Sequence, residues 1–187
     1  MSVATVSKRE RTLALLTERA LALFEEQGFD QTSVVQIAAS AGVSEMTFFR
    51  HFGSKEQAVL VDPFDPVIAR AIGQRPLGEA ALLRAVRGVR GALSGLDDAE
   101  LGMVRRRVRI IASTLTLRVA LAKQNEETAA AIQQQLISDG TDPRAARAAA
   151  AALLGALSAG LFEWAENEGT TLVEAIETAL SVLEVGA

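Results

Sequence analysis

Apolar residues recur every three or four positions near the start of the chain, the spacing that places side chains on one face of an α-helix. The first such stripe is Leu13, Leu16, Ala20 and Phe24, and Gly28 follows it. A glycine just beyond a helical stripe is typical of a left-handed C-terminal cap. The pattern therefore predicts one amphipathic helix that ends at Gly28.

Three shorter helices are expected after it. Thr32 or Ser33 can cap the second helix, Gly42 breaks it, Ser44 caps a third and Ser54 starts a fourth. The apolar face of the second helix would consist of Val34, Ile37, Ala38 and Ala41. A longer helix followed by two short helices with a tight turn between them is the arrangement of a helix-turn-helix.

The rest of the chain shows further helical stripes and no alternation with a period of two, so no strand is predicted. Asp142 followed by Pro143 is a strong signal for the start of a long helix. The expected fold is all-α, with about nine or ten helices. Two domains are expected: a helix-turn-helix domain over residues 1–61 and a ligand-binding and dimerisation domain over residues 62–187.

Composition narrows the classes of function. The chain has 187 residues, 49% of them hydrophobic, with no Cys and a single His. These counts leave no thiolate nucleophile and no His–carboxylate group with metal-ligand spacing, so we expect neither an enzyme nor a metal or cofactor. The longest apolar run is shorter than the roughly 20 residues of a membrane span. The N-terminus lacks the features of a secretory signal, and we expect a cytoplasmic protein without membrane contact.

Aromatic side chains are concentrated in one short stretch. Phe48, Phe49, His51 and Phe52 lie within five residues around Arg50, although the chain has only seven Phe, one Trp and no Tyr. Phe48 and Phe52 are four residues apart, so both can fill the interior of a small helical domain. Phe49 and Arg50 must then point elsewhere.

The segment "GFDQTSVVQIAASAGVSEMTFFRHFGSKEQAVL", from Gly28 to Leu60, resembles the DNA-binding segment of the TetR family of bacterial transcription regulators. Nearly every fixed position of the family's pattern is met. Phe48 stands where the family usually has Leu, which keeps an apolar plug. Phe49 stands where the family usually has Tyr, whose hydroxyl commonly reaches a phosphate. Phe49 cannot make that bond, so it either packs on the sugar–phosphate backbone or supports the turn.

The resemblance implies a homodimer that reads a near-palindromic double-stranded DNA operator, with one helix-turn-helix in each half-site. The residues that it implies in DNA binding are Thr32, Ser33, Ser44, Glu45, Met46, Thr47, Phe49, Arg50, His51 and Lys55. Residues 45–47 and Arg50 would face base edges, whereas His51 and Lys55 would contact backbone phosphates.

Charge alone does not predict a DNA-binding face. Residues 1–57 carry six basic and seven acidic side chains, and the whole chain has a net charge of −4, so such a face needs local segregation of charge. Glu45 either accepts a hydrogen bond from cytosine N4 or interacts only with the dipole of its own helix. The basic residues Lys8, Arg9 and Arg11 form either a DNA-contacting arm or a solvated terminus.

The second domain is similar to that of the mycofactocin-type branch of the family, in "TFFRHFGSKEQAVLVDPFDPVIARAI" and "VRIIAST". This resemblance implies an apolar tunnel for a small molecule such as a fatty acyl-coenzyme A. The candidate ligand contacts are Phe64, Ile68, Met103, Arg105, Arg106, Arg109, Leu117 and Leu121. The arginines of "RRRVR" could receive an anionic head group. Alternatively, they form a solvated face paired with Glu79, Asp97, Asp98 or Glu100.

A stripe of small residues predicts where two subunits would meet, because helices approach closely where side chains are small. The candidate interface residues on the helix that begins at Pro143 are Ala148, Ala152, Ala156, Gly160 and Trp164. The family resemblance adds that the last two long helices usually form a four-helix bundle with a second subunit. The alternative is an ordinary buried core helix.

The expected function is a DNA-binding transcriptional regulator, a repressor that a small apolar or acyl-coenzyme A-like ligand releases from its operator. The alternative is a constitutive or architectural DNA-binding protein without a ligand. The separate apolar second domain argues against that alternative, because proteins that read only DNA shape are usually small and strongly basic.

Overall fold

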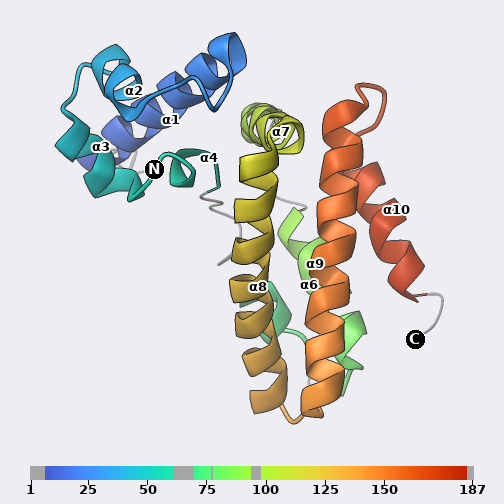
Figure 1. Cartoon of the computed structure of the whole chain (residues 1–187). Coiled ribbons are helices and arrows are strands. Elements are labelled where there is room, and N and C mark those ends of the chain that lie inside the picture. The colour runs from blue at the N-terminus through green and yellow to red at the C-terminus, as the bar shows by residue number, and fades with distance from the viewer. Residues whose placement is uncertain (1–6, 61–69, 77, 94–97, 185–187) are drawn as a thin grey trace, which may run out of the picture.

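The computed structural model describes residues 7–60, 70–76, 78–93 and 98–184. Within these ranges the chain folds into nine helices and a helical turn at 70–73, and no strand is present (Figure 1). Four helices form a small N-terminal unit, the head: α1 (Lys8–Gln27), α2 (Val34–Ser40), α3 (Glu45–Phe52) and α4 (Gln57–Leu60). Five form a larger unit, the body: α6 (Ala81–Leu93), α7 (Asp98–Ser113), α8 (Leu115–Ser138), α9 (Pro143–Glu166) and α10 (Leu172–Glu184). The expected all-α class is confirmed, whereas the expected boundary at residues 61–62 lies outside the described residues.

Serine caps set the starts of the head helices. The side chain of Ser33 accepts from the Gln36 amide while Gln36 bonds back to Ser33, so Ser33 and not Thr32 caps α2. Ser44 caps α3 in the predicted place. Gly28 ends α1 with a φ of 86° but an extended ψ of 154°, which is not the left-handed helical cap that the sequence predicts.

The interior of the head is filled by aromatic rings, as the sequence predicts. Phe48 is 0% and Phe52 4% exposed, and their ring centroids lie 5.2 Å apart. Phe24 and Phe29 complete the cluster at 5.0 Å from one another. Phe49 is 46% exposed and touches only the edge of this core, through Phe48. Large rings therefore let a few side chains fill a small interior.

The body is organised around α9, which packs against α6, α7, α8 and α10. Asp142 caps it and Pro143 occupies its first turn, as predicted. Among the described helices, α9 alone is long and apolar enough to span a membrane by length and composition. Its contacts with four other helices explain that apolar composition as the composition of a central core helix.

The head and the body share one apolar core. Ile110 and Ile111 of α7 and Leu117 of α8 are buried in the same cluster as the head residues Leu16 and Phe24. Leu117 is 0% exposed, so the structure gives this predicted ligand contact a packing role at the junction of the two units.

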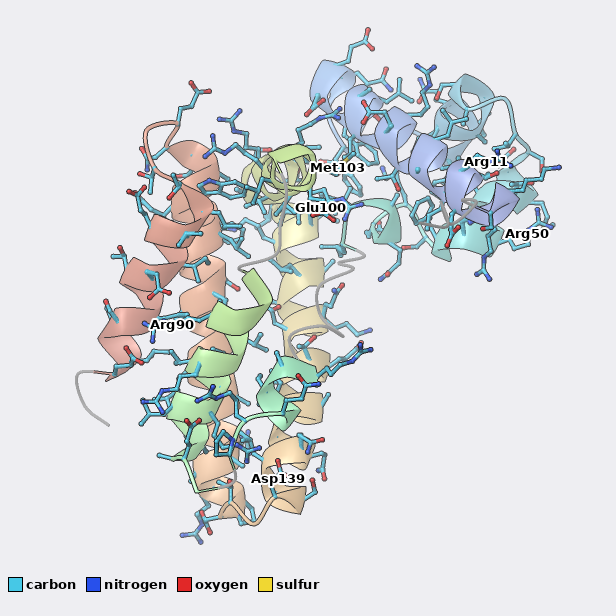
Figure 2. The ribbon with its side chains drawn as sticks, turned by 180° about the vertical axis from the view of Figure 1, so that it is seen from behind. Arg11, Arg50, Arg90, Glu100, Met103 and Asp139 are labelled. Carbon is cyan, nitrogen blue, oxygen red and sulfur yellow. The ribbon has the colours of Figure 1, made fainter. Side chains whose placement is uncertain are left out.

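Two ion-pair groups secure α6. Arg84 is buried, and its guanidinium donates to Asp139 in the loop after α8 over 2.7 Å, which lowers the pKa of Asp139. Arg90 lies between Glu177 and Glu184 of α10, 2.7 Å from each (Figure 2). These contacts join helices that are far apart in the sequence.

Gly88 marks the closest backbone approach in the body. A Cβ at this position would lie 2.6 Å from Ile72 Cγ1 and 2.8 Å from Ile72 Cα. Gly91 lies on the same helix, one turn later, and a Cβ there would meet nothing within 4 Å. The first glycine is therefore required by packing and the second is not.

Gly88→Ala is expected to lower the free energy of unfolding by about 1–3 kcal/mol, because the backbone of Ile72 cannot move aside as a flexible side chain could. Gly91→Ala is the matched control and is expected to raise it by about 0.5–1 kcal/mol, because alanine favours the helix. Chemical denaturation of both variants measures the difference. Equal effects of the two substitutions would contradict the packing argument.

Candidate DNA-binding surface and ligand pocket

Helix α3 presents one face to solvent. Met46 is 76% exposed, and Glu45, Phe49 and Arg50 are also exposed. The Arg50 guanidinium donates to Thr47 Oγ1 over 3.3 Å, and this bond holds Arg50 along the helix. The opposite face is anchored by the buried Phe48 and Phe52, so α3 is a rigid support for an exposed reading surface.

A basic hollow of about 770 Å³ lies beside α3. It is lined by Lys8, Arg9, Thr12, Gly42, Val43, Thr47, Arg50 and His51. Lys8 and Arg9 belong to the first turn of α1, so they are held on a helix and do not form a loose arm. Figure 2 shows Arg11 and Arg50 together on the side of the head that faces away from the body. This grouping is the local segregation of charge that the overall acidic composition conceals.

His51 contributes a hydrogen-bonding group to the hollow, where its protonated form is disfavoured. Its burial, followed by the nearby charges of Arg9 and Arg50, lowers its pKa below 6.5. A neutral imidazole can still donate one hydrogen bond to a phosphate oxygen. The positive charge of the hollow therefore comes from Lys8, Arg9 and Arg50.

Thr32 has an internal role in the structure, unlike the exposed Ser33. It is 2% exposed, and its hydroxyl donates to Gly28 O over 2.8 Å and accepts from Gln27 Nε2 over 3.1 Å. These bonds shape the loop between α1 and α2. They replace the phosphate contact that the sequence predicts for this hydroxyl.

Lys55 is also directed into the head. Its ammonium donates to Phe29 O over 2.8 Å and to Thr32 O over 3.0 Å, and it lies 4.1 Å from the centroid of the Phe29 ring. The side chain therefore clamps the α1–α2 loop against the start of α4. The predicted phosphate contact would have to use the one remaining N–H of this ammonium.

A second cavity, of about 120 Å³, lies in the body next to the head. Most of its wall is apolar and comes from α4, α7, α8 and α9. The polar groups that line it are Arg107, Gln124, Asn125, Thr128 and Ser158. Leu121 is the one predicted ligand contact in this wall among the residues that the structure describes, while Phe64 and Ile68 lie outside them.

The predicted arginines face other parts of the molecule. Arg105 stacks 4.5 Å from the Trp164 ring and donates to Thr170 O. Arg109 donates to Ala165 O over 2.7 Å. Arg106 pairs with Glu18 and Glu25 of α1, and Met103 packs against the head core (Figure 2). These contacts correct the prediction of a head-group site at Arg105, Arg106 and Arg109, and the acidic partners of Arg106 and Arg109 are Glu18, Glu25 and Glu168.

The arginine that does line the cavity is Arg107, a member of "RRRVR" that is not among the individually named candidate contacts. Val104, Val108 and Ile111 line the cavity with it. Steps of three and four residues place these four positions on one face of α7. The position of Arg107 on the apolar face of α7 therefore follows from its spacing, which the charge of "RRRVR" alone does not reveal.

Two of the predicted interface residues are internal to the protomer. A Cβ at Gly160 would lie 3.0 Å from Ala175 O, so this glycine allows α10 to approach α9. Trp164 is 3% exposed and lies under Arg105. Ala148 is exposed, whereas Ala152 and Ala156 are half-buried. The small residues that α9 leaves exposed are Ala145, Ala148, Ala151, Gly155 and Ala159.

Two family models match this chain. Residues 16–60 match the model described as bacterial regulatory proteins, tetR family. Residues 80–187 match the model described as MftR C-terminal domain. The first match contains α2, α3 and α4, and the second contains the five body helices.

Known relatives agree with both matches. The chain is 40% identical over 96 residues to the HTH-type transcriptional regulator TcmR of Streptomyces glaucescens, covering 50% of this chain and 42% of TcmR. It is 26% identical over 184 residues to MftR of Mycobacterium tuberculosis, whose name assigns it to mycofactocin biosynthesis, covering 96% and 92% of the two chains. The fold is similar to that of FadR from Bacillus subtilis in complex with stearoyl-CoA, with a TM-score of 0.52 and 22% identity over 93% of this chain and 98% of that one.

Arg9→Ala is expected to weaken DNA binding equally for all sequences, because a cation in the hollow beside α3 can neutralise a phosphate but carries no base information. The slope of log affinity against log salt should fall by about one unit. Fluorescence anisotropy over a salt series measures both quantities. The control is Arg147→Ala at the far end of the body, and a change in base preference with Arg9→Ala would contradict the assignment.

Lys55→Met is expected to lower the unfolding free energy of the protein by about 1–2 kcal/mol, because two loop carbonyls lose their charged donor. Thermal unfolding of the free protein detects this loss. Unchanged unfolding together with weaker DNA binding would instead favour the phosphate contact that the sequence predicts.

Proposed function

As a member of the TetR family of bacterial regulatory proteins with an MftR-type C-terminal domain, the chain is a DNA-binding transcriptional regulator, and we propose that it is a homodimeric repressor released from its operator by a small apolar ligand. Each head would read one half of a near-palindromic site through α3. Because its target is chromosomal DNA, we assign it to the cytoplasm.

The observation that carries the ligand response is that the cavity and the head share α4. Val59 and Leu60 at the end of the head line the cavity. Gln124 of α8 donates to Leu60 O over 3.1 Å, next to that wall. A molecule that enlarges the cavity on this side therefore displaces α4 or its contacts. It shifts the head only if it binds the two arrangements with different affinity.

The walls favour a compact, mostly apolar ligand with one hydrogen-bonding end. A volume of about 120 Å³ is small beside the roughly 300–1,000 Å³ of typical ligand pockets. Asn125 Nδ2 donates to Ser158 Oγ over 3.0 Å, and Thr128 is among the polar groups of the wall that can orient a guest. A fatty acyl-coenzyme A, as FadR holds, is the larger candidate and would require more of the wall to move.

The exposed faces of the last two helices support a homodimer. On α9 they carry the small residues Ala151, Gly155 and Ala159. On α10, Val173 and Val182 are 55% and 72% exposed but lie on opposite sides of the helix, so one of them can join the same interface. Apolar and small side chains on exposed helix faces are suited to close helix packing with a second copy. Two heads in one dimer would bind two half-sites and gain affinity from their linkage.

Leu161→Trp tests the ligand response, because the larger side chain fills the cavity that Leu161 lines. The experiment first isolates the DNA fragments that the protein retains. It then titrates the complex with compact aromatic compounds and with acyl-coenzyme A thioesters of increasing chain length. Wild type should release DNA, whereas the variant should need at least tenfold more ligand, equivalent to about 1.4 kcal/mol.

The matched control for this titration is Ile137→Trp, an equal enlargement of a residue that packs against the same apolar core as Leu161 but does not line the cavity. If the thioester concentration needed to release DNA falls as the acyl chain lengthens, the ligand is an acyl chain. Each buried methylene adds about 0.8 kcal/mol to the binding free energy. Equal responses of wild type and Leu161→Trp would place the ligand elsewhere.

Gly155→Leu tests the dimer without disturbing the protomer, because a Cβ at Gly155 meets nothing within 4 Å. An interface there should lose about 1–3 kcal/mol through overpacking. Analytical ultracentrifugation should show more monomer than for the control Ala130→Leu, an exposed position on α8. An unchanged dimer would place the interface on another face.

A further inference from the structure

We infer that Arg106 is the positioning residue that sets the orientation of the head on the body, and that a ligand in the cavity releases DNA by disengaging it from α1. The second part rests on the proposed ligand-controlled function. The first part concerns the ligand-free protein and can be tested by itself.

One guanidinium holds two carboxylates of α1. Arg106 Nε and Nη2 donate to the two oxygens of Glu25 over 2.8 and 2.7 Å, and Nη1 donates to Glu18 over 3.0 and 2.8 Å. Glu18 and Glu25 are seven residues apart, about two helical turns, so they lie on the same face of α1. The bonds to Glu25, and then those to Glu18, raise the pKa of Arg106, which keeps it charged.

Helix α7 connects this contact to the cavity. Val104 and Val108 line the cavity, while Arg106 and Ile110, each two positions from Val108, contact the head. A helix turns by about 100° per residue, so adjacent positions serve different neighbours while moving as one body. A guest that displaces the α7 side of the cavity wall therefore also displaces Arg106.

The contact is suited to orientation more than to stability. The side chain of Arg106 is 30% exposed, and those of Glu18 and Glu25 are 48% and 41% exposed. Ion pairs this exposed add little to folding, because water solvates the separated charges almost as well. The bidentate geometry with Glu25 is directional, however, and it fails after a small rotation.

Among the described residues, three contacts that attach the head to the body differ in their properties. The apolar contact of Ile110, Ile111 and Leu117 can act as a pivot, since apolar packing is not directional. The bond from Gln124 to Leu60 O holds α4, and Arg106 holds α1. Without Arg106, the apolar contact and the bond from Gln124 to Leu60 O would remain, but the head could rotate about them.

The absence of cysteine makes the orientation measurable. Ala14→Cys on α1 and Gln134→Cys on α8 are exposed sites for two spin labels, and pulsed electron paramagnetic resonance gives the distribution of their distance. Arg106→Gln should broaden this distribution and weaken operator binding on the order of fivefold or more. Arg109→Gln is the control, because Arg109 bonds only within the body among its described contacts.

Charge exchange separates orientation from folding. Arg106→Glu should broaden the distribution as well, and adding Glu25→Arg should narrow it again. An Arg106→Gln distribution as narrow as that of wild type would overturn the inference, and so would failure of the exchanged pair to restore it.

The link to the ligand is tested with stearoyl-coenzyme A and with the compact aromatic compound that releases most DNA. Either compound, once it releases DNA, should broaden the wild-type distribution to that of Arg106→Gln. Release without any change in distance would overturn the ligand part. If neither compound releases DNA, the proposed function fails for these ligands, and the ligand-free distances still decide the role of Arg106.

Discussion

The shared apolar packing of α7 and α8 against the head is the interaction on which the rest of the molecule depends. A head of about fifty residues buries little apolar surface by itself, and domains this small are marginally stable. Its interior is extended into the body by Ile110, Ile111 and Leu117. The head gains this additional apolar packing only when it is docked on the body. In a regulator with this junction, the stability of the head depends on the conformation of the body.

Polar contacts then give this apolar junction its direction. Lys55 fixes the loop between α1 and α2 from within the head, and Gln124 and Arg106 fix the head on the body from two sides. Each contact is weak beside the buried rings, because each is partly solvated. Their value is geometric: two heads of a dimer must meet successive major grooves, and a rotation of one head misplaces its recognition helix.

The sequence predicts the elements better than it predicts the side-chain partners. The stripe of Leu13 to Phe24, the serine caps and the Asp142–Pro143 start specify helices through local rules, and the structure confirms them. The roles of Thr32, Lys55 and the arginines depend on which element lies opposite, and spacing along one helix does not contain that information. Arg107 is an exception, because its place among Val104, Val108 and Ile111 on one face of α7 follows from spacing alone. The sequence predicts a subunit interface at Gly160 and Trp164, because nothing local reveals that α10 lies against Gly160 and that Arg105 of α7 covers Trp164.

Three consecutive arginines on α7 have three different destinations. Arg105 stacks on Trp164, Arg106 reaches α1 and Arg107 lines the cavity. A substitution at one of them affects one contact and leaves the other two in place. The loss or gain of a single residue earlier in α7 would instead turn the helix by about 100° and send every arginine to its neighbour's destination. We therefore expect proteins that keep this arrangement to differ in α7 by substitutions and not by insertions or deletions.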